Sequence, residues 1–594
     1  MKRAVHLVLL VGAISALPIV VAGCGGASKT SSSSSAPAAG AGKQGGKVTF
    51  LAAADVDYVD PGQTFYTFGY QVHYAINRTL YSFTPADGVN PVPDLAVGPA
   101  EISADGKTVT VKIKKGVKYA PPVNREVKAA DIKYAFERSY SKNVPSQYAS
   151  SYFTGIEGVD AAKIGSGPIA PISGIQTPDD NTIVFKLKDA SGPVFAQSLV
   201  MPITTPVPEE YAKPFDAKIP TTYDQYVAMS GPYMIKNDAS GKLVGRVPGK
   251  SITMIRNPNW DKATDYRPAY VDAIDIQEGN DDQAVAARRT LTGNGLMCCD
   301  SGSPPAEVLK GALANNKDQV EFIPSGGGRW IALNTTIKPF DNLNVRKAII
   351  AFTDRNALRQ TRGGAVVGAI AQAYIPPGVP GFNESGGLNA NKDLDFMASE
   401  TGDPAVSRKY MDAAAAEGLP IKDGKWTGTE PFLTVATNAD PGKKTAEAFQ
   451  GQIEKLGFKL KLRIVPQDAL YSKFCNVPAQ KIAICTNVGF FRDFNDGQAV
   501  LYSTFNGKAI LPVGNSNWSQ LNVPAINDAL DAAKALPLGP ERNTAFAKAN
   551  RLIVEQAPAI PWLWDTTVVI QSKDVTGAVN GYTTGHDFSF VSLK

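Results

Sequence analysis

Residues 432–465 read FLTVATNADPGKKTAEAFQGQIEKLGFKLKLRIV, and this stretch decides the fold class. A short apolar strand at residues 432–436 leads through a polar turn into an amphipathic helix, which Gly457 ends. The apolar residues of the helix recur at helical spacing: Phe449, Ile453 and Leu456. Those of the next strand alternate with charged residues: Leu460, Leu462 and Ile464. Strand, crossover helix and strand predict a βαβ unit with parallel pairing, so the chain is of the α/β class.

The same two periods recur on the N-terminal side of this unit. Period-two alternation predicts strands at Val109, Val111 and Ile113, and at Ile183, Phe185 and Leu187. Helical spacing predicts apolar stripes at Ile132, Ala135, Phe136 and Tyr140, and at Val345, Ala348, Ile349 and Phe352. No fixed-period repeat is visible, which argues against solenoids and propellers.

Composition favours binding over chemistry. The chain has 594 residues, 43% of them hydrophobic, and a net charge of +5, so it can bury more than one core and does not resemble a nucleic-acid binder. It contains only 3 histidines, which leaves little for a zinc site or a histidine-dependent triad. Phosphate-loop, dinucleotide, G-x-S-x-G and H-E-x-x-H motifs are missing from the sequence. We therefore expect no catalytic residue, no metal and no cofactor.

The N-terminus reads as a secretory leader. A basic start, Met1 to Arg3, precedes an apolar run that ends in small residues before Cys24, which predicts a signal peptide over residues 1–23. This ending resembles the lipobox of bacterial lipoproteins, in which Cys24 would carry the lipid. The alternative, an uncleaved transmembrane helix, is disfavoured because Pro18 interrupts a short run. Residues 24–46, rich in Gly, Ser and Ala, predict a flexible tether.

The other cysteines fit an exported protein. Cys475 and Cys485 predict a disulfide, which in the chain-entropy model would stabilise the fold by roughly 2.5 to 3 kcal/mol. The alternative is two buried thiols. For the adjacent Cys298 and Cys299, the bridged and free states stay equally open, and neither pair has the spacing of a zinc site.

Four stretches, in order along the chain, resemble family 5 extracellular solute-binding proteins, the dipeptide- and oligopeptide-binding components of ABC importers. The first stretch covers residues 94–138, including SADGKTVTV and DIKYAFER, and the second pairs SGPY at 230–233 with ITMIRNPNW at 252–260. The third is IALN at 331–334 with NVRKA at 344–348 and Asp354-Arg355, and the fourth runs from Glu541-Arg542 through APAIP at 557–561 to Asp587-Phe588. The sequence departs from the family pattern at Ala120-Pro121-Pro122 and at Lys128, in positions that look structural.

The resemblance implies a fold: a two-lobed, periplasmic-binding-protein-like α/β clamshell of type II, in the large peptide-binding class, with two hinge-crossing strands. Lobe I would comprise residues 47–277 plus 560–594, and lobe II residues 278–559. The crossings would fall near Val271 to Gln277 and Pro561 to Ile570. Closure of such lobes over a ligand is a hinge motion.

The resemblance also implies an anchor for the peptide's amino terminus. In the family, an Asp in a Trp-x-x-Asp loop holds this ammonium group, and the matching segment here is GFFRDFND at 489–496. It places Asp493 in the acidic position, Phe490 in that of the Trp, and Phe491 and Arg492 between them. Alternatively Asp493 is an Asx-turn residue, and Arg492 could neutralise it.

Aromatic residues supply candidate cleft walls. Phe65, Tyr66 and Phe68 lie in the stretch where family members touch ligand, and Trp518 is a similar candidate. Tyr70 and Tyr74, at helical i, i+4 spacing, are predicted to be core residues.

These observations predict a monomeric, lipid-anchored protein on the extracytoplasmic face of the cell membrane. It would capture a peptide or peptide-like solute and deliver it to an ABC permease, without catalysis and without nucleic acid. Three alternatives remain open: the same fold binding a nickel chelate, an oligosaccharide or an opine; a secreted hydrolase; and a signalling or adhesive lipoprotein.

Overall fold

The structure is a computed structural model and describes residues 42–300, 303–577, 579–583 and 585–594. The predicted signal peptide, Cys24 and most of the predicted tether lie outside the described residues. At the tether's end, Lys43 forms a β-bridge with Leu593, and the Gly45 N–H donates to the Tyr270 carbonyl at 2.8 Å. The folded body therefore includes residues before the predicted start at 47. Of the helices within the described ranges, none has both the length and the hydropathy of a membrane span.

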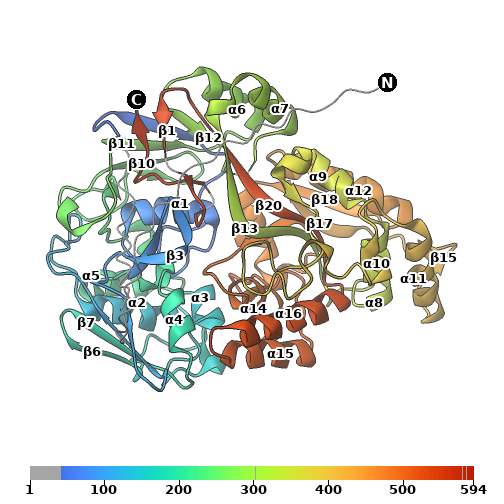
Figure 1. The fold of residues 1–594 in the computed structure, drawn as a ribbon, viewed down its shortest axis with the longest axis horizontal. Coiled ribbons are helices and arrows are strands. Elements are labelled where there is room, and N and C mark those ends of the chain that lie inside the picture. The colour runs from blue at the N-terminus through green and yellow to red at the C-terminus, as the bar shows by residue number, and fades with distance from the viewer. Residues whose placement is uncertain (1–41, 301–302, 578, 584) are drawn as a thin grey trace, which may run out of the picture. The chain divides into compact units, whose positions relative to one another are not determined.

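One twelve-stranded sheet is the framework of the described chain, in the order β18-β17-β19-β13-β20-β12-β1-β11-β10-β8, with β14 and β9 attached beside this path. At its centre, β13 (Val320–Leu333) and β20 (Ala559–Gln571) pair antiparallel along most of their length. In Figure 1 these two long strands run side by side between two groups of elements, here called the first and the second half. The α/β class and the two crossing strands are confirmed.

In the first half, β1 (Lys47–Leu51) pairs in parallel with β11 (Ala273–Gln277) and β12 (Leu296–Cys298). A separate sheet has the order β4-β5-β7-β6, formed by Glu101–Ile102, Thr108–Lys112, Thr182–Lys186 and Ile175–Asp179. The two alternating strands predicted here are neighbours, with Val109 opposite Phe185. The helices of this half include α1 (Thr67–Ile76), α4 (Gly192–Ser198), α5 (Glu209–Asp216) and α2 (Ala129–Ser139), whose Phe136 ring packs 5.2 Å from that of Phe185.

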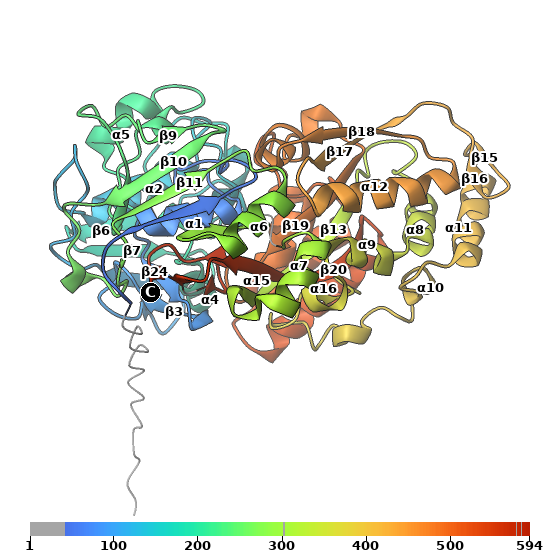
Figure 2. The same ribbon diagram turned by 90° about the horizontal axis from the view of Figure 1, so that it is seen from above.

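The second half contains the predicted βαβ unit. Strand β17 (Phe432–Thr437) leads into α12 (Gly442–Ile453), Gly457 takes a positive φ of 88° at the end of the following turn, and β18 (Leu460–Val465) pairs with β17 in parallel. Strand β19 (Ile484–Phe491) lies between β17 and β13. The surrounding helices, visible in Figures 1 and 2, are α8 (Leu343–Phe352), α9 (Arg355–Arg362), α11 (Pro404–Ala416), α14 (Gln498–Phe505), α15 (Pro524–Ala535) and α16 (Pro540–Glu555).

The strand pairings show which strands run between the halves. Strand β20 pairs with β12 of the first half at its C-terminal end and with β13 along most of its length, so it runs between the halves near the predicted crossing at 561–570. The other predicted crossing, residues 271–277, is wrong. Its strand β11 pairs with β1 and β10 (Ser251–Arg256), and both Ile274 and Ile276 are buried in a first-half core. The second long strand is β13. The exact lobe boundaries stay a prediction.

Two disulfides are present among the described residues. Cys475 is joined to Cys485, as predicted, and Cys298 is joined to its neighbour Cys299. The first bond ties the helical turn before residue 476 to β19. The second lies directly before Asp300, which lines the cavity described next.

Candidate functional site

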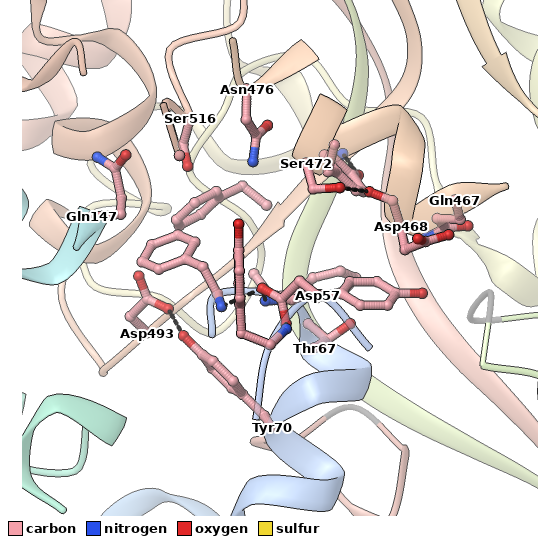
Figure 3. Close-up of a pocket in the computed structure, with 18 of the residues that line it drawn as sticks. Asp57, Thr67, Tyr70, Gln147, Gln467, Asp468, Ser472, Asn476, Asp493 and Ser516 are labelled. Atoms are coloured by element: carbon pink, nitrogen blue, oxygen red, sulfur yellow. Dashed lines mark hydrogen bonds between the residues drawn. The ribbon is translucent and has the colours of Figure 1, made fainter. Parts of the chain in front are cut away.

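A cavity lies between the two halves, and side chains from both form its walls (Figure 3). The first half contributes the loop before α1, part of that helix and the start of α3 (Gln147–Ser151), represented in Figure 3 by Asp57, Thr67, Tyr70 and Gln147. The second half contributes the end of β19, the turns at residues 467–476, which include α13 (Gln467–Ala469), and the loop that contains Ser516. Figure 3 shows Gln467, Asp468, Ser472, Asn476, Asp493 and Ser516. A solute bound here would contact both halves at once.

Asp493 follows β19 directly and is only 3% exposed. Its carboxylate accepts hydrogen bonds from two hydroxyls of the first half, Tyr70 Oη at 3.1 Å and Tyr152 Oη. Within the described residues, no lysine or arginine forms an ion pair with it. Burial raises the pKa of Asp493 to about 7, and the two tyrosine hydrogen bonds only partly oppose that rise. The site holds a desolvated acid whose charge has no matching cation.

Arg492 does not neutralise its neighbour. Its Nη2 donates to the Gly88 carbonyl at 2.8 Å, and burial lowers the pKa of this guanidinium. Glycines on β13 make room for this arrangement, because a Cβ at Gly326 would collide with the Arg492 side chain and one at Gly327 with the Phe491 ring. The alternative in which Arg492 pairs with Asp493 is therefore not what the structure shows.

Aromatic rings from both halves form a continuous wall of the cavity. The Phe65 ring lies 4.8 Å from Tyr148 and 5.7 Å from Phe490, measured between centroids. The Phe490 ring lies 6.4 Å from Trp518, whose Nε1 donates to Asn476 at 2.7 Å. Tyr66 and Tyr471 continue the wall at 6.2 Å. The predicted wall residues Phe65, Tyr66, Phe490, Phe491 and Trp518 all line this cavity.

Two aromatic predictions need correction. Phe68 lies outside the cavity: it is fully buried and its ring stacks on Phe50 at 5.3 Å. Because α1 begins at Thr67, its second residue already faces the first-half core. Tyr70, predicted as a core residue, is buried, but its hydroxyl reaches Asp493 and it lines the cavity. Tyr74 packs in the core as predicted.

Further carboxyls line the part of the cavity away from Asp493; Figure 3 shows Asp468 and Asp493 on opposite sides. Asp57 accepts the backbone N–H groups of Phe65 at 2.6 Å and Tyr66 at 3.0 Å, so it holds the loop that presents both rings. Asp300 accepts the Ala53 N–H at 2.8 Å. Burial raises the pKa values of Asp57 and Asp300 to about 6 each. Burial also raises the pKa of Asp468 above its ordinary value.

Arg329 on β13 also lines the cavity, with its guanidinium 5.8 Å from the centroid of the Phe491 ring. Its Nε donates to Asp565 on β20, and Arg362 on α9 donates to the same carboxylate oxygen at 3.3 Å. Burial lowers the pKa of Arg362 to about 10. Two guanidinium groups thus meet one carboxylate beside the cavity.

Three polar side-chain atoms of buried lining residues have no hydrogen-bond partner among the described residues: Tyr66 Oη, Gln147 Oε1 and Thr567 Oγ1. Buried polar groups in proteins are normally paired, so such atoms mark places where a bound molecule or water completes the bonding. Within the described residues, no group of three or more His, Cys, Asp or Glu side chains is arranged to hold a metal ion.

The sequence did not reveal most of these partners. Tyr152 and Asp493 are 341 positions apart, and Arg329 and Asp565 are 236 apart. No local pattern marks such pairs. The local signals that pointed to the cavity were the 489–496 segment and the aromatic residues near position 66.

Comparisons with known proteins agree with this architecture. The model of the bacterial extracellular solute-binding proteins, family 5 (middle region), matches residues 90–510. The oligopeptide-binding protein OppA of Bacillus subtilis is 25% identical over 486 residues, covering 81% of each chain. A dipeptide-binding protein of Pseudomonas aeruginosa is 27% identical over 508 residues, covering 82% of this chain and 84% of that one. The solved clavulanic acid biosynthesis oligopeptide binding protein 2 superposes with a TM-score of 0.71 at 25% identity, covering 93% of this chain and 96% of that one.

Proposed function

The chain belongs to the bacterial extracellular solute-binding proteins of family 5, and on that premise we propose that it captures a short peptide or peptide-like solute and delivers it to an ABC permease. The names of the two curated relatives refer to oligopeptides and dipeptides, which supports a peptide ligand here. The family is one of substrate-binding proteins, and we propose that this member has no catalytic activity of its own.

One observation carries the proposal: the buried Asp493 carboxylate faces the cavity with neutral hydroxyls as its partners. The free ammonium terminus of a peptide would supply the missing positive charge. Hydrogen bonds between ionised partners are roughly twice as strong as neutral ones, and exclusion of water strengthens them further. In this role Tyr70 and Tyr152 orient the carboxylate.

The rest of the cavity suits a ligand whose side chains vary. The wall of Phe65, Phe490 and Trp518 offers apolar and π-stacking contact without demanding one side-chain shape. The unpartnered Gln147 Oε1 and Thr567 Oγ1 can bond peptide N–H groups. For the carboxylate end we propose the neighbourhood of Arg329, where two guanidinium groups share Asp565.

Ligand binding would favour the closed arrangement of the halves. Asp493 in the second half bonds Tyr70 in the first, and Arg492 bonds Gly88 in the same way, so the contacts between the halves flank the ligand. A ligand that contacts both sides stabilises this arrangement over an open one, and a permease can distinguish the two. Only two adjacent long strands, β13 and β20, would need to bend.

We further propose that the mature chain is a monomer held on the extracytoplasmic face of the membrane by a lipid on Cys24. The motif that ends at this cysteine and the Gly/Ser-rich segment after it support the anchor and a flexible tether. Mass spectrometry of protein from membranes, before and after inhibition of lipoprotein processing, would test the lipid.

The test of the binding function compares matched peptides. Isothermal titration calorimetry of the purified protein would use di- to pentapeptides and the same peptides with an acetylated N-terminus. We expect free peptides to bind and acetylation to weaken binding by about thirtyfold or more, because it removes the charge that Asp493 pairs. Peptides recovered afterwards should be intact.

Equal binding of free and acetylated peptides would refute the role of Asp493. Binding of a nickel chelate, an oligosaccharide or an opine, with no binding of any peptide, would replace the ligand class. Cleaved peptide in the recovered sample would show a hydrolase instead.

A further inference from the structure

The part of the cavity away from Asp493 concentrates carboxyl groups, and we call it the acidic end. Its lining carboxyls are those of Asp57, Asp300 and Asp468. Asp55 and Glu278 belong to the same region. Burial first, and then the charge of Asp55, raises the pKa of Glu278 to about 9. Asp468 adds to the same rise.

Cations around the acidic end are few. Arg246 bonds Asp224 at 2.6 Å and lies 3.4 Å from Asp55, and it is the described cation that forms ion pairs with this group. Lys473 is solvent-exposed and lowers the pKa of Asp468 only slightly against the effect of burial. The carboxyls of Asp55, Asp224 and Glu278 act on the buried Arg246 guanidinium. The three lining carboxyls, those of Asp57, Asp300 and Asp468, form no ion pair with a lysine or arginine of the described residues.

A second observation, independent of the acids, points to a ligand group at this place. Tyr66 is 9% exposed and lines the cavity, yet its hydroxyl has no hydrogen-bond partner among the described residues. After burial itself, the charges that act most strongly on this hydroxyl come from the acidic end and its wall: Asp300, Tyr471, Asp468 and Asp57. The lone pairs of Tyr66 Oη are therefore available to a donor that enters among these carboxylates.

The geometry points to a second cationic group on the bound solute: we infer that the acidic end receives the basic side chain of a lysine- or arginine-containing short peptide, while Asp493 holds the ammonium terminus. This inference rests on the proposed function and names the substrate class within it. The selecting residues are Asp468 and Asp300, with Tyr66 Oη as an additional acceptor.

Charge decides this selectivity more than shape does. An ammonium or guanidinium group has three to five N–H donors and no acceptor, which suits a site of carboxylate and hydroxyl oxygens. A neutral side chain would leave the desolvated carboxyls without a cation, and an acidic side chain would be repelled by their like charge. Arg329 already bonds Asp565 and lies beside Phe491; it and Arg362 also act on Tyr471, but neither forms an ion pair with Asp57, Asp300 or Asp468.

Matched peptides separate charge from size. Tri- and tetrapeptides with lysine at one position would be compared by calorimetry with the same peptides carrying Nε-acetyl-lysine, which keeps the stem and removes the charge. At the position that reaches the acidic end, we expect lysine to bind at least about tenfold more tightly. At the other positions the two forms should bind alike.

Variants locate the effect. Asp468→Asn should reduce the preference for lysine over acetyl-lysine by about three- to tenfold and leave binding of acetyl-lysine peptides unchanged. Tyr66→Phe should weaken lysine peptides by a few fold, and it is expected to fold normally because the hydroxyl bonds no described residue. Asp412→Asn, which removes one exposed carboxylate on α11 paired with Arg408, is the matched control and should change nothing.

The outcomes separate this inference from the proposed function. If lysine and acetyl-lysine peptides bind equally, peptide binding stands and the inference is wrong. If lysine peptides bind more tightly than acetyl-lysine peptides but Asp468→Asn and Tyr66→Phe change this preference no more than Asp412→Asn does, the acidic end does not cause the preference and the inference is wrong. If no peptide binds at all, both fail. An Asp468→Asn protein that did not fold would leave Tyr66→Phe to decide.

Discussion

Buried carboxylates in the first half pair with arginines, whereas the buried carboxylate of Asp493 in the cavity has hydroxyl partners. In the first half, Asp265 lies 2.8 Å from Arg267, Asp94 lies 2.7 Å from Arg78, and Arg267 also reaches Asp94 at 3.3 Å. Burial alone would raise the pKa of Asp265, but Arg267 and Arg78 outweigh it and lower the pKa below its ordinary value. Asp493 is equally buried, faces two hydroxyls, and has a raised pKa.

This difference distinguishes carboxylates that stabilise the fold from a carboxylate that can bind a ligand. Burial of a carboxylate is unfavourable in both places, and within the folded chain only the first group is compensated. A carboxylate in a cavity wall that has no cation as partner destabilises the ligand-free fold. A cationic ligand pairs with it, so the same carboxylate makes the cavity selective for cationic ligands. Each prediction below tests one side of this contrast.

We expect the largest effect on stability from removing a cation of the buried ion-pair network in the first half. Arg267→Met leaves Asp265 and Asp94 with less compensation, and it also removes donors to the carbonyls of Tyr74 at 2.6 Å and Asn77 at 3.1 Å. We expect the free energy of unfolding to fall by about 3–5 kcal/mol, measured by urea denaturation.

Arg551→Met is the control, because Arg551 pairs with Asp393 at the surface, where the loss should stay below about 1 kcal/mol. Equal losses in the two variants would mean that the buried charge network adds nothing beyond a surface ion pair.

Asp493→Asn should show the opposite behaviour. The amide keeps partners for the tyrosine hydroxyls but cannot pair an ammonium group, so peptide binding should weaken by about 2–4 kcal/mol while the protein stays folded. Calorimetry measures the first quantity and thermal unfolding the second. If the variant lost stability while its folded fraction bound peptides with the affinity of the parent protein, Asp493 would be a structural carboxylate.

The pH dependence is a smaller effect. Only the ionised form of Asp493 pairs an ammonium group, so with a pKa of about 7 the affinity for an alanine-based peptide should fall about tenfold per pH unit below 7, with proton release on binding. Titrations between pH 5 and pH 8 would measure this slope. A flat profile in the parent protein would contradict the raised pKa.

The stability of the ligand-free protein should depend on pH with a definite sign. Because the folded-state pKa of Asp493 is raised, the folded state binds this proton more tightly than the unfolded state does. The contribution is fully present below the ordinary pKa near 4 and is lost as pH rises through about 7. Asp493→Asn should therefore be more stable than the parent above pH 7, and the difference should shrink toward pH 4.

Local patterns predicted the elements better than their connections. The unit of β17, α12 and β18 has the predicted pairing because its periods and the stop at Gly457 lie within one segment. The crossing assigned to residues 271–277 was wrong because an apolar alternating strand looks the same whether it ends inside one half or passes between two. In the structure that role belongs to β13.

The residues of the site also fall into those that the sequence predicted and those that it did not. The family resemblance led to Asp493 and Phe490 and to the stretch of Phe65 and Tyr66, and Trp518 was a further aromatic candidate; all five line the cavity. Phe68 was misassigned because a shift of one residue at the start of α1 turns a side chain from the cavity to the core. The acidic end was not foreseen, since its members come from segments as distant as Asp57 and Asp468.

By itself, the sequence determined the α/β class, the family, the disulfide between Cys475 and Cys485 and the position of the acid in the 489–496 segment, because each depends on residues close together in the chain or on an ordered series of motifs. Only the tertiary structure decided which carboxylates have cations. Burial and charge pairing depend on surroundings that remote segments assemble. An aspartate is structural where it pairs with Arg267, as Asp265 does, and can receive a ligand where its partners are hydroxyls, as Asp493 does with Tyr70 and Tyr152.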